Sequence, residues 1–274
     1  PMSWRAVSKN DLRVALATRG VWTLTAGLLV LLTGLGYVVP RLAGSSEVPF
    51  SAYLDILVAI VVPLFPVIGL VLGYRSIAAG CASGTATLAL SLPNSRRDLV
   101  AGKFVGRATA LAASLAIAGV VAGGYLFASY SDFAAGDYLL VLVLTFGYTL
   151  AFLGIAVGLS TGITSSRRVI GAAFGAYALL ALLWGTLVDA VLNVLFRFEP
   201  PMETPAWVEF AKFIEPGTSA SYLFATELGV GTAPPEAVIG TEQFVSTVGA
   251  LAVLIAWIIV PVVLGYARFQ RSEL

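Results

Sequence analysis

Histidine is absent from this chain of 274 residues, and cysteine occurs once, at Cys81. Without histidine the chain lacks the usual general base and the commonest metal ligand. A single cysteine rules out an intrachain disulfide and argues against a cysteine-based metal site. The glycine-rich nucleotide loop is also missing, because Gly102-Lys103-Phe104 has neither the upstream glycine nor the following hydroxyl residue. We therefore expect no enzyme, no cofactor and no ATP bound by this chain.

Charge is scarce as well. Charged residues make up 11% of the chain and hydrophobic residues 58%, with a mean hydropathy of +0.92, which excludes a soluble globular domain. A helix needs about 20 apolar residues to cross ~30 Å of hydrocarbon. The sequence predicts an all-α membrane protein, one domain over 1–274, with six transmembrane helices at 21–39, 53–74, 108–129, 138–160, 169–195 and 246–267.

The few basic residues are distributed unevenly between the predicted spans. Placing the stretches 2–19, 75–107, 161–168 and the C-terminal end on one side leaves only Arg41, Arg197 and Lys212 on the other. Basic residues mark the cytoplasmic side of membrane proteins. We expect a multi-pass protein of the cytoplasmic membrane with both termini in the cytoplasm.

An amphipathic helix is predicted over residues 2–19. Arg5, Lys9 and Arg13 follow one another at helical spacing, and apolar residues lie largely on the other side. Such a helix can rest on anionic headgroups as an elbow before the first span. The alternative is a frayed cytoplasmic start of that span.

The stretch 75–107 is the most distinctive part of the chain. A Ser-Gly-Thr turn precedes a short leucine-rich piece, and Pro93 and Asn94 follow. Asn94 or Ser95 can cap a helix whose first turn holds Asp98. A basic stretch of this kind suits docking of a soluble partner. Alternatively, Arg96 and Arg97 could contact anionic lipid. The candidate docking residues are Ser83, Gly84, Thr85, Leu88, Leu90, Leu92, Pro93, Asn94, Arg96, Arg97, Asp98 and Lys103.

The segment 196–245 is predicted to be extracellular and is acidic. Pro205 starts a helix whose apolar face holds Trp207, Phe210, Ala211 and Ile214. A second short helix follows at 219–228, so we expect a pair of short helices at the outer membrane surface before the last span.

Two acidic residues fall within the predicted spans. A carboxylate in the bilayer costs at least ~2.5–3.5 kcal/mol, so intramembrane acids are functional candidates by default. Asp55 and Asp189 are therefore candidates for the translocation path, although both lie toward the outer ends of their spans.

The stretch 83–103, read as Ser-Gly-Thr, leucines, Leu-Pro-Asn-Ser-Arg-Arg-Asp and Gly-Lys, resembles the first cytoplasmic loop of ABC-2 type transporter permeases. The match is with the branch common in haloarchaea, related to permeases of nitrous-oxide reductase maturation. That family usually has a Glu-Arg-Glu-like triplet before Ser83. Here Gly80, Cys81 and Ala82 stand in its place, which implies weaker gripping of the partner.

This resemblance implies a permease dimer that moves a substrate with two separate ATPase subunits, which bind the ATP and push the stretch 75–107. Membrane lipids are expected as partners, and nucleic acid is not. The alternative is a membrane scaffold or assembly factor that recruits a partner without transport. Lipid, small hydrophobic compounds, an ion or a sulfur species stay open as substrates. A soft-metal path is disfavoured by the scarcity of methionine and cysteine.

Overall fold

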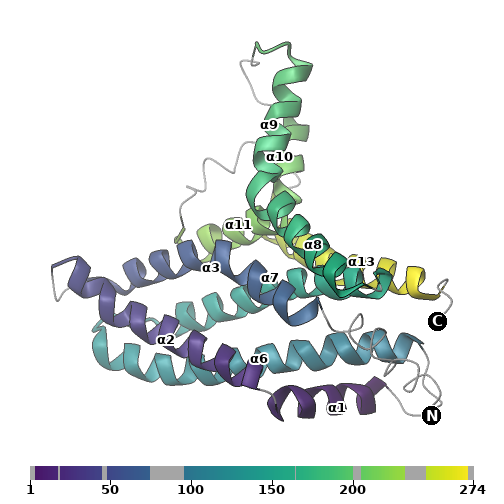
Figure 1. Cartoon of the computed structure of the whole chain (residues 1–274). Coiled ribbons are helices and arrows are strands. Elements are labelled where there is room, and N and C mark those ends of the chain that lie inside the picture. The colour runs from purple at the N-terminus through teal and green to yellow at the C-terminus, as the bar shows by residue number, and fades with distance from the viewer. Residues whose placement is uncertain are drawn as a thin grey trace.

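The computed structural model describes residues 4–17, 19–44, 48–74, 96–163, 165–199, 205–231 and 245–270, and these are helical apart from short connections (Figure 1). The helices are α1 (Trp4–Ala17), α2 (Arg19–Leu42), α3 (Phe50–Gly73), α6 (Arg96–Ser129), α7 (Ala135–Gly162), α8 (Ser166–Tyr177), the π-helix η1 (Ala178–Leu183), α9 (Trp184–Leu195), α10 (Ala206–Phe213), α11 (Pro216–Leu228) and α13 (Thr247–Gln270).

Six helical segments of the described chain are long and apolar enough to cross a membrane, so the predicted all-α fold with six spans is confirmed. Their bounds are 19–42, 50–73, 97–129, 135–161, 167–195 and 247–270. The third departs most from expectation, because α6 begins at Arg96 with Asp98 in its first turn and continues without a break to Ser129. The end of the predicted docking stretch is therefore the first third of a membrane-spanning helix.

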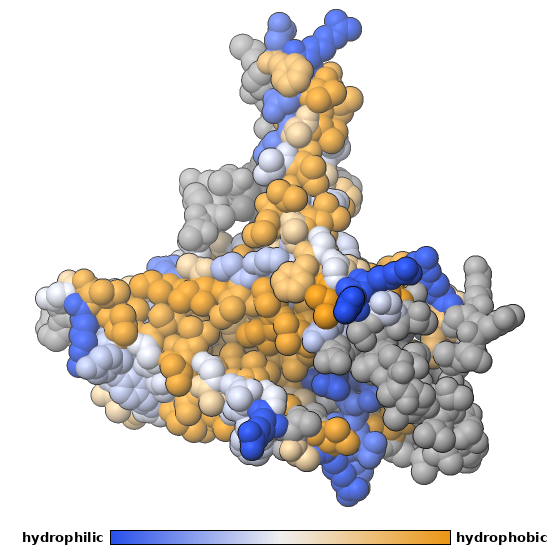
Figure 2. Space-filling view, in the orientation of Figure 1, coloured by the Kyte–Doolittle hydropathy of each residue, from blue (hydrophilic) through white to orange (hydrophobic). Residues whose placement is uncertain are grey.

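Five of the long helices, α2, α3, α6, α7 and α13, form a bundle (Figure 1). The beginnings of α1 and α6 and the end of α13 lie at the same end of it. Figure 2 shows apolar surface over much of the visible bundle, with hydrophilic surface gathered toward its ends. This distribution is the one expected for helices that face hydrocarbon along their length and water at their ends.

An aromatic cluster closes the end of the bundle opposite to α1. Phe50 stacks on Tyr53, with ring centroids 5.4 Å apart, and meets the rings of Tyr130 and Phe133 edge-on. The Phe50 amide donates to Asp132 Oδ2 at 2.9 Å. The start of α3 is thereby tied to the turn between α6 and α7.

Small residues set the closest helix contact, between α7 and α13. A Cβ atom at Gly154 would lie 2.6 Å from the Ile258 carbonyl oxygen, and one at Gly265 would lie 2.5 Å from that of Gly158. Glycine spacing of this kind lets membrane helices approach backbone to backbone. These glycines therefore let α7 and α13 pack closely along each other.

Helices α9 and α10 stand away from the bundle as a pair, called the arm below (Figure 1). The Lys212 ammonium lies 2.6 Å from Asp189 Oδ1, and the Trp184 indole donates to the Ala211 carbonyl at 2.7 Å. Apolar side chains of the arm, among them Val194, Leu195 and Phe210, are exposed. The arm thus holds itself together but leaves apolar surface uncovered within one copy of the chain.

Candidate functional site

The predicted docking stretch is described only at its end. Ser83, Gly84, Thr85, Leu88, Leu90, Leu92, Pro93 and Asn94 lie outside the described residues. The backbone of Arg96 begins α6, and the side chain of Arg97 is exposed. The Asp98 carboxylate accepts a hydrogen bond from the Trp4 amide at 3.2 Å. The start of α6 is therefore joined to the start of α1.

Further along this contact, α1 and α6 are joined by an ion cluster. Asp11 is only 3% exposed. Its Oδ1 atom lies 2.5 Å from the ammonium of Lys103, which donates a hydrogen bond to it. Its Oδ2 atom lies 3.0 Å from Arg107 Nε, a contact between charges that lacks hydrogen-bond geometry. We call Asp11, Lys103 and Arg107 the α1–α6 clamp.

Two glycines allow the clamp to close. A Cβ at Gly102 would lie 2.6 Å from the Cβ of Val7, and one at Gly106 would lie 2.9 Å from the Cβ of Asp11. Because these glycines are one turn apart on α6, α1 can lie directly on its backbone. The predicted N-terminal amphipathic helix is confirmed, with Arg5, Lys9 and Arg13 exposed, and it lies along the first half of α6.

The clamp changes the expected role of Lys103. This residue was predicted to contact a partner at the rim of the docking stretch, and that role stays a prediction. The structure gives it an internal partner, since its side chain is 28% exposed and is paired with Asp11. Arg97, which is exposed one turn and a half earlier, is better placed to meet an external partner.

A second arrangement lies in the middle of α3, where Pro63 and Pro66 stand inside the helix. Pro66 has no N–H to offer the Val62 carbonyl one turn earlier. The Tyr148 hydroxyl of α7 donates to that carbonyl at 2.8 Å. The Tyr177 hydroxyl of α8 donates to the neighbouring Pro63 carbonyl at 3.0 Å. Two other helices thus supply the donors at the proline-interrupted turn.

Helix α11 packs inside the bundle beside this turn. The predicted pair of short outer helices is confirmed as α10 and α11, but α11 does not lie on the surface, because its residues Ser219, Leu223 and Phe224 are at most 1% exposed. The Trp257 indole, near the middle of α13, donates to the Ile214 carbonyl at 2.8 Å. The turn between α10 and α11 therefore reaches the middle of the bundle as a re-entrant segment.

Glu215 sits at that turn and is 6% exposed. It caps α11, since its carboxylate accepts from the Gly217 and Thr218 amides at 2.6 and 2.5 Å and from the Thr218 hydroxyl at 2.9 Å. Burial raises the pKa of this carboxyl, and the two backbone hydrogen bonds oppose the rise. A Cβ at Gly217 would lie 3.2 Å from the Tyr148 hydroxyl. The cap thus touches the side chain that bridges to α3.

The two predicted intramembrane acids are not brought together. Asp55 accepts a hydrogen bond from the Gly231 amide at 2.9 Å, which ties α3 to the segment after α11. Asp189 pairs with Lys212 inside the arm. Their assignment to a translocation path stays a prediction. Over the described ranges, no group of three histidine, cysteine or acidic side chains is placed to hold a metal ion.

Six apolar spans, a long helix that carries the end of a basic stretch, and a re-entrant helix pair define a polytopic membrane permease. The chain belongs to the ABC-2 family of transporter proteins, whose family model matches residues 5–274. It is 28% identical over 281 residues to a Stutzerimonas stutzeri protein named "Probable ABC transporter permease protein NosY", and the match covers 97% of each chain. It is also 28% identical over 207 residues to the protein of the same name from Pseudomonas aeruginosa PAO1, covering 70% of this chain and 71% of that protein.

Asp11 and Glu215 are the two buried acids of the site that sequence reasoning missed, and Arg107, Tyr148 and Tyr177 were given no role in it either. Asp11 is the one acid in the basic N-terminal helix, on the side away from Arg5, Lys9 and Arg13, and that position was the available signal. Glu215 stands between the two predicted outer helices, directly before Pro216. That position is typical of a helix cap, but nothing in the sequence indicates that the cap is buried.

Proposed function

We propose that this ABC-2 family member is the permease subunit that moves a substrate across the cytoplasmic membrane while separate ATPase subunits bind and hydrolyse ATP. The observation that carries the proposal is the continuity of α6. Its 34 residues span ~51 Å at 1.5 Å per residue, against ~30 Å of hydrocarbon. About two fifths of the helix, ~21 Å, therefore extends beyond the hydrocarbon, next to the basic stretch that a partner would push.

The clamp makes that extension rigid. Because Asp11 fixes α1 to α6, and α1 leads after Thr18 into α2, a push at Arg96 moves α1, α2 and α6 together. The hydrophobic cluster of Leu99, Val100, Leu153, Val157 and Phe269 couples the same end of α6 to α7 and α13. A rigid-body shift of this kind is a common route for switching between two states.

The re-entrant pair is the part we assign to the gate of the translocation path. Helix α11 fills the bundle beside the proline-interrupted turn of α3, and Asp55 holds the segment that follows it. Opening a route past α11 requires the Glu215 cap or the tyrosine bridges to move. Asp55 would line the outer part of such a route, whereas Asp189 is paired with Lys212 in the arm and would reach it only if the arm moves. The substrate class stays as open as the sequence leaves it.

A second permease copy completes the proposal. The arm exposes apolar side chains that one copy of the chain leaves uncovered, and its helix α9 is the last part of the apolar segment Arg167–Leu195. Packing against the arm of a second copy would bury this surface. The orientation we propose places both termini, Arg97 and Arg167 in the cytoplasm, as the positive-inside rule predicts.

The test uses the permease purified with its ATPase. We expect Leu88→Asp to abolish co-purification, because an apolar wedge would be lost from the partner's groove. The matched control is Leu42→Asp, at the C-terminal end of α2, where the leucine is 81% exposed. This variant should bind the ATPase normally. Unchanged ATPase binding by a correctly inserted Leu88→Asp variant would remove the docking role of the stretch.

A second measurement separates transport from scaffolding. Spin labels at positions 71 and 170, on facing parts of α3 and α8, report their separation. In a permease the separation changes when ATP is added to the complex and returns after hydrolysis. If the ATPase binds and hydrolyses ATP while the separation stays fixed, the chain is a scaffold.

A further inference from the structure

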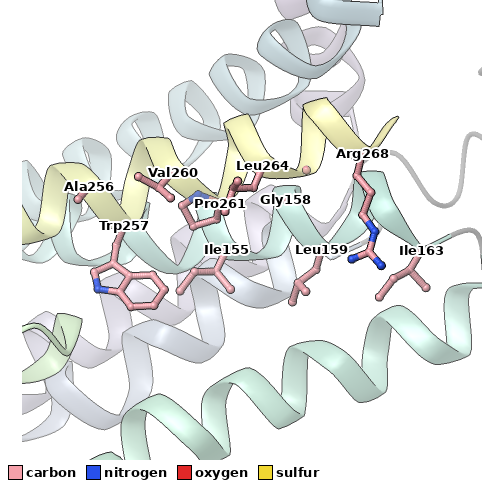
Figure 3. A pocket seen from close by; sticks show the side chains of 11 residues that line it. Ile155, Gly158, Leu159, Ile163, Ala256, Trp257, Val260, Pro261, Leu264 and Arg268 are labelled. Atoms are coloured by element: carbon pink, nitrogen blue, oxygen red, sulfur yellow. The ribbon is translucent and has the colours of Figure 1, made fainter. Parts of the chain in front are cut away.

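A groove of about 520 Å³ runs between α7 and α13 (Figure 3), and one end of it touches the turn between α10 and α11 through Trp257. Two of the glycines that bring these helices together, Gly158 and Gly265, line it. Val260 and Leu264, which line it from α13, are 49% and 64% exposed. The groove therefore opens on the outside of the bundle, where a membrane protein meets lipid.

The groove is apolar along its length and cationic at one end. In Figure 3 the Trp257 ring and the Arg268 guanidinium stand at opposite ends of a row formed by Ile155, Leu159 and Ile163. Trp257 uses its indole N–H on the Ile214 carbonyl, which fixes the ring as an apolar end wall. Between these two ends the groove is lined by apolar side chains and glycines, so it suits an apolar ligand there.

Its length matches one leaflet. Trp257 and Arg268 are eleven residues apart on α13, which corresponds to ~16 Å at 1.5 Å per residue. Half of a ~30 Å hydrocarbon core is ~15 Å. A chain that fills the groove from the middle of the bundle therefore ends at Arg268 just where a headgroup begins.

The charge at that end is uncompensated among the described residues. Arg268 is exposed and forms no ion pair there. Arg167 and Arg168, also exposed, begin α8 a few residues after Ile163, which lines the same end of the groove. The exposed guanidinium of Arg268 at this end of the groove favours a ligand with a negatively charged head.

We infer that the α7–α13 groove is a binding site for an anionic phospholipid. One acyl chain lies between α7 and α13 and ends against Trp257, and the phosphate-bearing headgroup meets Arg268. The inference does not rest on the proposed transport function, because it needs neither the ATPase nor a substrate. It assigns to α13 a role in selecting lipid that the family membership does not supply.

The experiment measures quenching of Trp257 by brominated acyl chains. The permease is placed in phosphatidylcholine vesicles containing a minor fraction of brominated phosphatidylglycerol, or of brominated phosphatidylcholine. A Trp257→Phe variant gives the background from the other four tryptophans. Because one basic residue near a surface favours anionic lipid by about 1 kcal/mol, we expect roughly fivefold stronger apparent binding of the anionic lipid.

Variants separate the two parts of the site. Arg268→Gln should abolish the preference for phosphatidylglycerol and Arg268→Lys should keep it, while Arg13→Gln, an exposed arginine on α1, serves as the control. Leu159→Phe, which fills the groove, should lower quenching by both lipids. Val263→Phe, on the same helix as Trp257 but outside the groove, should not.

Several results would overturn the inference. Equal quenching by the two lipids in the unaltered protein would show that the groove holds only ordinary boundary lipid. A preference that survives Arg268→Gln would show the same. Relief of quenching by soluble glycerol phosphate would show an anion site without a lipid chain. Retained emission of Trp257 without brominated lipid confirms that each variant is folded.

Discussion

Replacing Asp11 by asparagine should detach α1 from α6 while the bundle stays folded. The substitution leaves the cations of Lys103 and Arg107 facing a buried amide. Removing one partner of a buried ion pair costs about 3–5 kcal/mol. Since both cations keep 28% of their side-chain surface and can turn toward water, we expect the lower end, about 3 kcal/mol.

Hydrogen–deuterium exchange of the amides in α1 measures this loss directly. Local opening controls exchange, and ~3 kcal/mol corresponds to roughly a hundredfold faster exchange at 25 °C. Amides of α7 should not change. Asp137→Asn, an exposed acid in the first turn of α7, is the matched control and should leave α1 unaffected.

Neutralising the cations tests the cause. Asp11→Asn combined with Lys103→Gln and Arg107→Gln removes the uncompensated charges, so most of the protection of α1 should return. If Asp11→Asn alone leaves exchange unchanged, the contacts of Val7 and Ser8 with Gly102 and Gly106 hold α1 without the charges, and the clamp is not what fixes it.

Three further predictions concern topology, the α3 turn and the re-entrant cap. In a Cys81→Ser background, cysteines at positions 97 and 167 should react with an impermeant thiol reagent only from the cytoplasm, and one at 209 only from outside; the reverse at 209 would overturn the orientation. Tyr148→Phe should lower the free energy of unfolding by about 1–3 kcal/mol, because the Val62 carbonyl loses its donor and Pro66 has no N–H to replace it. Tyr177→Phe should lower it by under ~1 kcal/mol, because the Pro63 carbonyl still has the Val67 N–H one turn later in α3, so equal losses would contradict this account. Because burial raises the pKa of Glu215, the folded state keeps its proton to higher pH than the unfolded state, so the free energy of unfolding should fall as pH rises from about 4.5 toward the folded value. Glu215→Gln should remove that dependence in pH-resolved thermal unfolding, and an unaltered slope would assign it to another group.

Hydropathy and charge were enough to predict the spans, the N-terminal helix and the outer helix pair. Each depends on local composition and periodicity, which a single sequence carries. The start of α6 was placed correctly by its capping signal, but its continuity through residues 96–129 was not. The first third of α6 is basic, and this composition did not indicate that the same helix continues into the membrane.

The tertiary contacts could not be predicted in the same way. Asp11 and Lys103 are 92 residues apart, and the Tyr148 hydroxyl and Val62 carbonyl are 86 apart. The side of the first outer helix that packs against protein is not the apolar face predicted for it. Trp207 and Phe210 are exposed, whereas Val208 and Phe213 are buried. The face that packs was decided by the partner helices and not by helical periodicity alone.

The tyrosine bridges to α3 have a consequence for how this bundle can move. The hydroxyls of Tyr148 and Tyr177 come from different helices and end on adjacent carbonyls, those of Val62 and Pro63. Because Pro66 offers no N–H to the Val62 carbonyl, a small slide of α7 would leave that carbonyl without a donor, at a cost of about 1–3 kcal/mol. Intermediate positions are therefore unfavourable. The helices are expected to stay in one position until a push is large enough to carry them over this barrier to the next.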